Sequence, residues 1–257
     1  MLENLAQFTR GNLANRRNTL LQLLAGHQVS RQTFFTSEEE RYLNISTCYR
    51  NGYPKKRIAV SAHYDKVPSG EGALDNGSGV IVLLSLLARL QKEKPEVDVT
   101  FLFFDGEEEG CLGSSYFVRN NPPPFAAVYN ADVVGSGSSI VVARSSLDLH
   151  SKTFIDCPSF LIERTREVCL EMEIPFYDIP KAPMSDHVPF NQRGIPAVWL
   201  CTLPAWEASH WKMTGNFSGL PTFAHINGPS DTLDKVDLNS LQLAHHVMYN
   251  LLKRHFS

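Results

Sequence analysis

The chain has 257 residues, of which 43% are hydrophobic and 20% are charged, and its formal net charge is −3. These values are ordinary for a globular protein with one large domain or two small ones. The slightly acidic balance provides no basic surface, so nucleic acid and anionic membranes are not expected as partners.

Segments that direct a chain to a membrane or to secretion are not evident. The longest apolar run, residues 80–87, is interrupted by Ser85 and is well short of the ~18 residues that span a bilayer. The N-terminal residues lack the basic region followed by an apolar core that a secretory signal would have.

The five cysteines are scattered without a CxxC pair, which argues against disulfides and a structural zinc site. We therefore expect a cytoplasmic protein with free thiols.

The first fifty residues are predicted to form a helix and an antiparallel pair of strands. Apolar residues recur with roughly helical spacing over residues 2–24. Segments 32–35 and 42–49 alternate or cluster as strands do, and Asn51-Gly52 is typical of a hairpin turn.

The middle of the chain alternates strands and helices. Residues 57–62 form a short apolar strand, and a loop rich in small residues leads from it to a helix over 79–92. Apolar residues cover most of that helix, which indicates burial against a sheet. Residues 97–104 read as a strand buried on both faces, because four bulky apolar residues, 101–104, follow one another at its end.

The remaining elements continue the alternation. We predict a short helix that ends near Asn120 before three prolines, strands at 125–130, 140–143, 176–179 and 197–201, and helices at 159–172 and 239–255. Residues 181–193 are expected to be a loop, and 203–223 to be irregular. This order predicts an α/β fold, a three-layer sandwich whose central mixed, mainly parallel sheet is flanked by helices. Neither a repeat nor a low-complexity linker divides the chain, so we expect one domain over residues 1–257.

Polar side chains follow the predicted strands where each strand ends. They are His63 and Asp65, then Asp75 in the next loop, Glu107 and Glu108, and Asp132. Because parallel strands bring their carboxyl ends to one edge of a sheet, these groups are expected to meet. Histidine with carboxylates and no thiolate suits catalytic zinc, and manganese or cobalt would also be accepted. The alternative is a solvated acidic loop, since adjacent carboxylates repel one another unless solvent or a cation compensates.

The number of these groups permits two metal ions. Paired-metal hydrolases commonly bridge ions about 3.5–4 Å apart with a carboxylate, and Asp75 is the best candidate because its loop is short and Gly-rich. Glu107 and Glu108 are neighbours, so their side chains diverge. One can bind a metal while the other acts as a general base.

Five segments in chain order resemble the M28 family of metallopeptidases, the co-catalytic zinc aminopeptidases. They are His63-Tyr64-Asp65, Asp75-Asn76-Gly77-Ser78-Gly79, Glu107-Glu108-Glu109-Gly110-Cys111-Leu112-Gly113-Ser114, Asn130-Ala131-Asp132, and His225 before Asp231-Thr232. The resemblance runs from about residue 57 to residue 236. It implies a zinc-exopeptidase-like fold and the removal of N-terminal amino acids from peptides with a free N-terminus.

The resemblance also implies a role for each of these residues. Two zinc ions per chain would be held by five ligands: His63 and Asp132 on one ion, Glu108 and His225 on the other, and Asp75 between them. Glu107 would be the general base that takes a proton from a metal-activated water, and Asp65 would orient His63. A cis peptide after Asp75 is a further feature of the family.

Two parts of the resemblance carry further expectations. His225 lies six positions before Asp231, whereas the family spacing is usually four, and the longer loop between them is expected to absorb the difference. His187 and His210 are the alternatives for this ligand. Asp186 and His187 belong to a segment that resembles part of the family's substrate pocket, so we expect one of them to contact the substrate or the oxyanion.

Two other functions compete with an aminopeptidase. Glutaminyl cyclases have a similar fold with one zinc ion, and the stretch from Phe103 to Glu108 also resembles them. A non-catalytic peptide-binding module is the second alternative, and loss of the base or of several ligands would mark it. The number of metal ions per chain discriminates between the peptidase and the cyclase.

Overall fold

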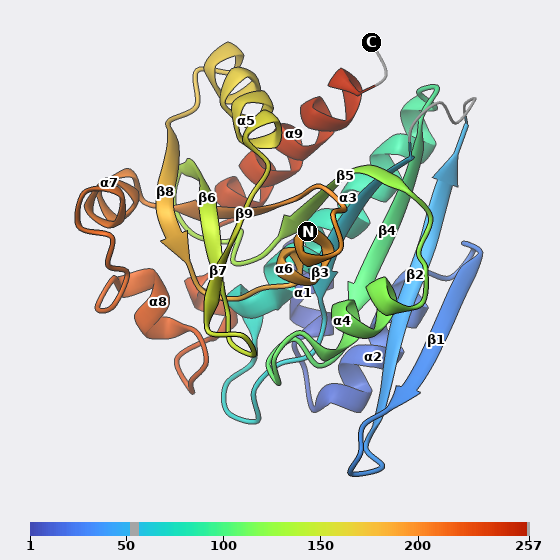
Figure 1. Ribbon diagram of the computed structural model, residues 1–257. Helices are drawn as coiled ribbons and strands as arrows, with labels where there is room; N and C mark the ends of the chain where they lie inside the picture. Colours follow the sequence, from blue (N-terminus) through green and yellow to red (C-terminus); the bar gives the residue numbers. More distant parts are fainter. Residues whose placement is uncertain (52–56, 256–257) are drawn as a thin grey trace.

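The computed structural model describes residues 1–51 and 57–255, and within them one mixed sheet of nine strands lies between helices (Figure 1). In spatial order the strands are β1 (Val29–Phe35), β2 (Arg41–Arg50), β4 (Asp98–Phe104), β3 (Arg57–His63), β5 (Phe125–Ala131), β9 (Ala197–Leu203), β6 (Ser139–Asp148) and β7 (Thr153–Asp156), and β8 (Phe176–Ala182) also pairs with β6. The four central strands β4, β3, β5 and β9 are parallel, whereas β1, β2 and β7 are antiparallel to their neighbours.

Helices cover both faces of the sheet. One face carries α1 (Leu2–Phe8), α2 (Leu13–Leu23), α3 (Ser78–Glu93), α5 (Ser159–Glu171) and α9 (Leu238–Arg254), and the other carries α4 (Leu112–Arg119), α6 (His187–Gln192) and α7 (Ala205–Thr214). Two short elements, α8 (Pro221–His225) and a 3₁₀ turn at Leu233–Lys235, precede α9. The predicted α/β sandwich is confirmed.

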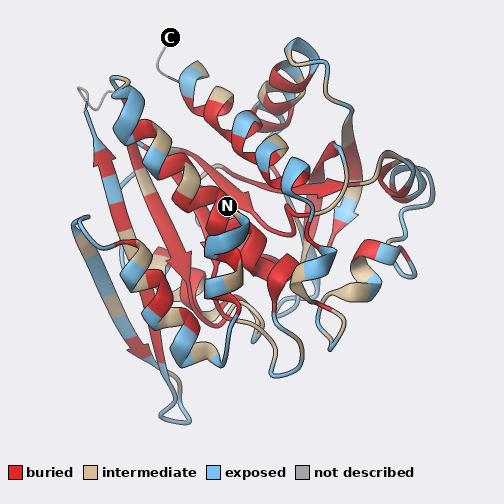
Figure 2. Ribbon diagram, turned by 180° about the vertical axis from the view of Figure 1, so that it is seen from behind, coloured by how far each residue is buried: buried red, intermediate tan, exposed pale blue. Residues whose placement is uncertain are grey.

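Strand β4 shows why both faces need a helical layer. Phe101 and Phe103 pack in the cluster formed with α3 and α9, while Leu102 and Phe104 point the other way, toward α4 and α6. All four side chains are buried. Because successive side chains of a strand alternate between faces, a continuous apolar run fits only a strand covered on both sides. Buried residues are accordingly concentrated in the central strands and in the helix behind them (Figure 2).

Helix α3 is the central helix of the larger apolar cluster. Residues Ala73–Glu93 are long and apolar enough to cross a membrane by composition, but 83% of that apolar window is buried inside the protein. The stretch therefore has the burial of a core helix, as its all-round apolar surface predicted.

Several local predictions are wrong. Residues 2–24, which were expected to form one helix, form two, α1 and α2, and these are separated near Gly11 (φ 86°). Asn12 caps α2 by accepting a hydrogen bond from the Asn15 amide at 3.1 Å. Gly52 of the expected hairpin lies outside the described residues, and the flanking strands β2 and β3 each pair with β4 instead of with each other. The stretch expected to be irregular contains α7 and α8, and the loop expected at 181–193 contains α6.

Asp178 on β8 joins elements of the outer part of the sheet. Its buried carboxylate contacts Arg166 of α5 at 3.2 Å, Lys212 of α7 at 2.6 Å and Nε of Arg144 on β6 at 2.8 Å. Burial works to raise the pKa of Asp178, but the hydrogen bonds from Lys212 and Arg144 outweigh it, so the pKa lies below its usual value. The ionised carboxylate therefore stabilises the folded state.

We expect Asp178→Asn to lower the free energy of unfolding by about 1–3 kcal/mol at neutral pH, a range kept low because the three cations are partly exposed. Since the folded pKa is lowered, the contribution is complete above the unfolded pKa and is lost as the pH falls through the folded pKa. Urea unfolding of the wild type and of Asp178→Asn at about pH 7 and about pH 3 measures the difference in their free energies of unfolding. An equal difference at both pH values would contradict the assignment.

Candidate active site

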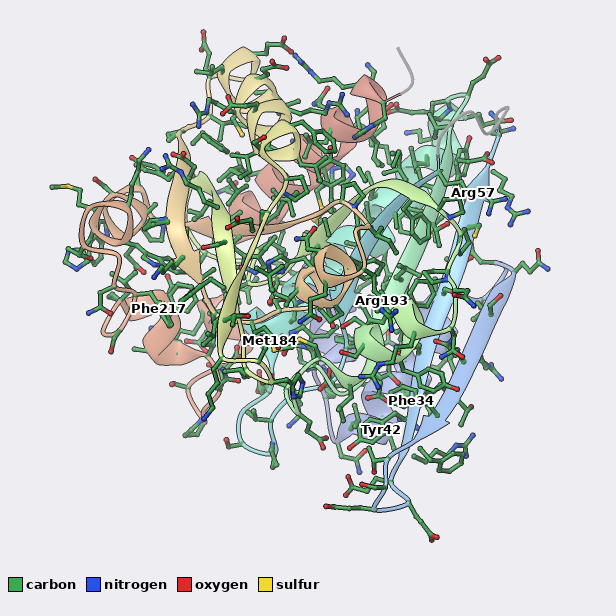
Figure 3. The ribbon with its side chains drawn as sticks, viewed as in Figure 1. Phe34, Tyr42, Arg57, Met184, Arg193 and Phe217 are labelled. Carbon is green, nitrogen blue, oxygen red and sulfur yellow. The ribbon has the colours of Figure 1, made fainter. Side chains whose placement is uncertain are left out.

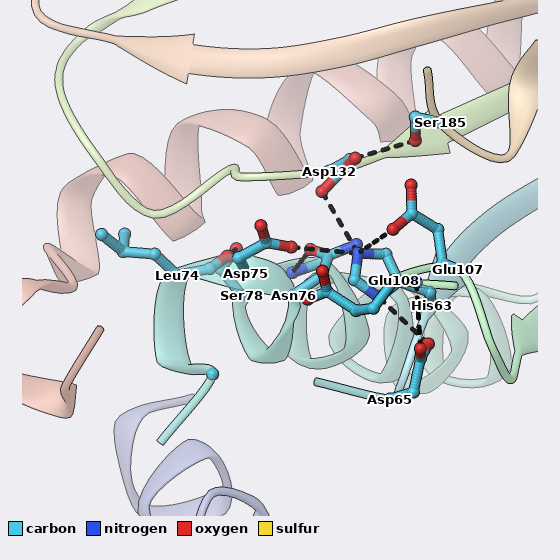
Figure 4. Close-up of polar contacts among 12 residues, drawn as sticks. His63, Asp65, Leu74, Asp75, Asn76, Ser78, Glu107, Glu108, Asp132 and Ser185 are labelled. Atoms are coloured by element: carbon cyan, nitrogen blue, oxygen red, sulfur yellow. Dashed lines mark hydrogen bonds and ion pairs between the residues drawn. The ribbon is translucent and has the colours of Figure 1, made fainter. Parts of the chain in front are cut away.

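Three neighbouring strands and one loop bring the predicted site residues to the same edge of the sheet. His63 ends β3 beside Phe104 of β4, Glu107 and Glu108 follow β4, and Asp132 follows β5. Asp75 lies in the segment Ala73–Gly77, directly before α3. These residues meet in space, as the parallel order of β4, β3 and β5 predicted (Figure 4).

The His63 imidazole lies at the centre of this group. Its Nε2 is 3.0 Å from Asp75 Oδ1, 3.5 Å from Asp132 Oδ1 and 3.8 Å from Glu107 Oε2. On the other side of the ring, Nδ1 is 3.3 Å from Asp65 Oδ1. Asp65 therefore lies in the position of a carboxylate that orients the imidazole ring.

Two groups of three potential ligands share His63. One group is His63, Glu107 and Asp132, and the other is His63, Asp75 and Glu108, and in each the candidate ligand atoms lie within 4.8 Å of one another. Apart from the ion-pair contacts given above, His63 Nε2, Glu108 Oε1 and Asp132 Oδ1 are buried without a hydrogen-bond partner among the described residues. Buried polar atoms are nearly always paired, so these unpaired donors and acceptors fit a bound cation.

The carboxylates of this site are difficult to ionise together. Burial, with the charges of Asp132 and Asp186, raises the pKa of Glu107 well above its usual value, although His63 opposes the shift. Burial and the charge of Asp75 raise the pKa of Glu108 to about 8. A divalent cation among them would favour the ionised forms and remove much of the repulsion.

Asp132 is held by a chain of hydrogen bonds that crosses two strands. Ser185 Oγ donates to Asp132 Oδ2 at 2.8 Å, Asn130 Nδ2 donates to Ser185 Oγ at 2.8 Å, and Ser61 Oγ donates to Asn130 Oδ1 at 2.9 Å. The supporting roles of Ser61, Asn130 and Ser185 were not predicted. Asn130 and Ser185 lie next to predicted site residues, but the sequence pattern does not distinguish a supporting residue from its neighbours.

Asp75 is held by Asp231. The Asp231 carboxylate accepts the backbone amides of Leu74 at 2.7 Å and Asp75 at 3.1 Å. The peptide between Asp75 and Asn76 is cis, as expected, and Asn76 Nδ2 donates to the Ala131 carbonyl at 2.9 Å. Asp231 entered the sequence argument only as part of the Asp-Thr pair, and its contacts give it a physical role as the anchor of the Asp75 loop.

Three predicted site residues lie apart from the two ligand groups. His225 ends α8, is half-buried and belongs to neither group, so its role as a ligand stays a prediction. Asp186 is fully buried, which raises its pKa to about 7. His187 is fully buried beside Ser146, with Nε2 at 2.8 Å from the Ser146 hydroxyl. A contact of Asp186 or His187 with substrate stays a prediction as well.

A cavity of about 150 Å³ opens over the carboxylates. Asp75, Glu107, Glu108 and Asp132 line one part of it, and the rest of the wall is mainly apolar: Val133, Pro183, Met184, Trp199, Phe217, Phe223 and Ile226. Met184 and Phe217 both line it and come from different segments of the chain, whose places are labelled in Figure 3.

Trp199 lines this cavity, whereas Trp206 and Trp211 do not. Trp211 is buried directly behind the wall, with its ring centroid 5.0 Å from that of Phe217 and 5.1 Å from that of Phe223. Trp206 is 60% exposed. The cavity therefore combines acidic groups with an aromatic wall that a buried indole supports.

Comparison with known proteins identifies relatives among peptidases. The model of peptidase family M28 matches residues 44–252. Aminopeptidase YwaD of Bacillus subtilis is 30% identical over 142 residues, which cover 54% of this chain and 30% of that protein. A vacuolar membrane protease of Lachancea thermotolerans is 37% identical over 90 residues, 35% of this chain and 9% of that protein. The matches thus span less than a third of the length of these relatives.

Solved structures share the fold. A glutaminyl cyclase of Porphyromonas gingivalis superposes with a TM-score of 0.77 at 23% identity, covering 99% of this chain and 96% of that one. A zinc aminopeptidase of Bacillus subtilis gives a TM-score of 0.67 at 23% identity, covering 84% of this chain and 51% of that one. The family match takes in His63, Asp75, Glu107, Glu108 and Asp132. The chain belongs to peptidase family M28.

Proposed function

We propose that this chain is a single catalytic domain of a zinc aminopeptidase that hydrolyses the N-terminal residue from peptides. The observation that carries the proposal is the pair of ligand groups that share His63, next to a cavity with an apolar wall. The relationship to an aminopeptidase supports it. His63, Asp132 and Asp75 would hold one zinc ion, and Asp75, Glu108 and His225 would hold a second. Bound zinc would supply a water molecule acidified to a pKa of about 7.

Glu107 would be the general base. Its carboxylate is buried, lies 3.8 Å from His63 and lines the cavity, where it can reach a water molecule bound at the metal. In this role Glu107 takes the proton from the attacking water and delivers it to the amine that leaves. Asp65 would keep the His63 ring in its orientation through Nδ1.

The two sides of the cavity suit the two ends of an N-terminal residue. A free α-amino group would lie at the acidic side of the cavity, which Asp75 and Glu108 line and where the zinc ions would be held. The apolar wall at Trp199, Phe217 and Phe223 can bury an apolar side chain. A peptide without a free N-terminus would lack the first of these interactions.

A glutaminyl cyclase is the second candidate, because its solved relative matches nearly the full length of both chains. A cyclase of this fold is expected to hold one zinc ion, so the metal content separates the two candidates.

We expect Glu107→Gln to lower kcat by at least about a hundredfold, because the amide cannot accept the proton of the attacking water. Zinc content should stay near that of the wild type. Release of p-nitroaniline from aminoacyl substrates and elemental analysis of the same samples measure the two quantities. The matched control is Glu109→Gln, next in the chain and hydrogen-bonded to Tyr42, which should keep its activity. Substantial activity in Glu107→Gln would overturn the assignment of the base.

We expect the purified protein to contain two zinc ions per chain and to lose both its peptidase activity and thermal stability when a chelator removes them. The loss of stability follows because the remaining buried carboxylates repel one another and bound metal no longer favours the folded state. One ion per chain, with cyclisation of a glutaminyl peptide and no release of N-terminal residues, would favour the cyclase.

The same metal analysis decides the role of His225. On the two-zinc hypothesis we expect His225→Ala to lose about one ion per chain, whereas His210→Ala, a change at an exposed histidine of α7, should keep both. If His225→Ala keeps both ions, the ligand assignment for His225 is wrong.

A further inference from the structure

Arg16 is a fully buried arginine in α2, outside the residues that match the family model. Among the described residues, its guanidinium donates only to backbone carbonyls. Nε donates to the Tyr64 oxygen at 2.7 Å, Nη1 to the oxygens of Glu71 at 2.8 Å and Gly72 at 3.0 Å, and Nη2 to the Asp65 oxygen at 3.5 Å.

These carbonyls belong to the two segments that carry His63 and Asp75. Tyr64 directly follows His63, and Gly72 lies three residues before Asp75. Gly72 has a left-handed backbone (φ 62°), and a Cβ added there would lie 2.7 Å from Arg16 Nη1. The close approach of the guanidinium to this loop therefore requires glycine.

The charge of Arg16 is balanced from a distance. In the described part of the chain its guanidinium forms no ion pair with a carboxylate, and it stacks on the Phe8 ring at 4.4 Å. Burial lowers the pKa of Arg16 to about 10, although the carboxylates of Asp65, Asp231, Asp75 and Glu108 act against this shift. The side chain thus stays charged near neutral pH, and its positive charge faces the acidic site.

We propose that Arg16 is a positioning residue of the metal centre, which fixes the separation of His63 and Asp75 by binding the backbone of both their segments. A planar guanidinium can hold several carbonyls at once in a fixed geometry, whereas a lysine ammonium at the same place cannot reach both loops equally. The inference rests on the proposed metal binding. It does not depend on whether the reaction is hydrolysis or cyclisation.

Arg17 provides a matched control on the same helix. It donates to the Tyr64 hydroxyl at 3.1 Å and to Asp105 Oδ2 at 2.7 Å, and so anchors α2 without binding the carbonyls of the metal-site segments. A substitution of Arg17 therefore shows how a weaker attachment of α2 by itself affects zinc binding.

The test compares Arg16→Lys and Arg17→Lys with the wild type. Zinc affinity is measured by competition with a chromogenic chelator, and thermal unfolding of the metal-free proteins is recorded in parallel. We expect Arg16→Lys to weaken zinc binding by about 10–100-fold, the usual effect of losing a residue that orients a ligand. Arg17→Lys should stay within about threefold of the wild type. The d–d absorption of cobalt-substituted Arg16→Lys should also change, because the ligand geometry changes.

Each outcome decides a separate point. If the wild type binds no zinc, the proposed function fails and this inference fails with it. If the wild type binds zinc and the two variants weaken its binding equally, or neither does, Arg16 is only a structural residue and the inference alone is overturned. If Arg16→Lys does not fold, Gly72→Ala replaces it. The added Cβ lies 2.7 Å from Arg16 Nη1, and also 2.8 Å from Lys66 Cβ and 3.0 Å from the Asp75 oxygen, so unchanged zinc affinity in that variant overturns the inference.

Discussion

The crowding of buried carboxylates around one imidazole is the constraint on which the site depends. Asp75, Glu107 and Asp132 all lie within 4 Å of His63 Nε2, and Glu108 is close enough to share a ligand group with it. Burial and like charges raise the pKa of Glu107 and Glu108, whereas at Asp132 burial is outweighed by the hydrogen bond and the charge of His63, which lower its pKa. A scaffold that resists the repulsion among these groups has to hold each carboxylate from behind.

The scaffold holds the loops through contacts between residues far apart in the sequence. Asp231 binds the amides next to Asp75, Ser185 binds Asp132, and Arg16 binds the carbonyls next to His63. Each of these partners is itself buried, where a hydrogen bond is stronger and an unpaired group is costly. The positions of the ligands are therefore set by the tertiary fold, and the motif loops by themselves would not keep them in place.

This division explains what the sequence could predict. The order of strands and helices, the strand buried on both faces and the meeting of His63, Asp75, Glu107 and Asp132 follow from local patterns and from parallel pairing. The role of Arg16 could not be predicted, because its acceptors lie about fifty residues further along the chain. Helix α7 was missed because it has no regular apolar face: Trp206 and Met213 are exposed, whereas Glu207 is buried and accepts the Thr222 amide at 3.2 Å.

The two ligand groups and most of the aromatic wall come from different parts of the chain. Both groups follow strands or a loop of the parallel centre, whereas His225, the remaining proposed ligand, ends α8. Phe217 and Phe223 of the aromatic wall come from the segment around α7 and α8, where Trp211 supports them from behind, and Trp199 comes from β9. Neither Phe217 nor Phe223 belongs to a ligand group, so their exchange would leave those groups in place. On the proposed function, these two residues are where the preference for one N-terminal side chain over another would be set, and their exchange would alter KM among substrates more than the metal content.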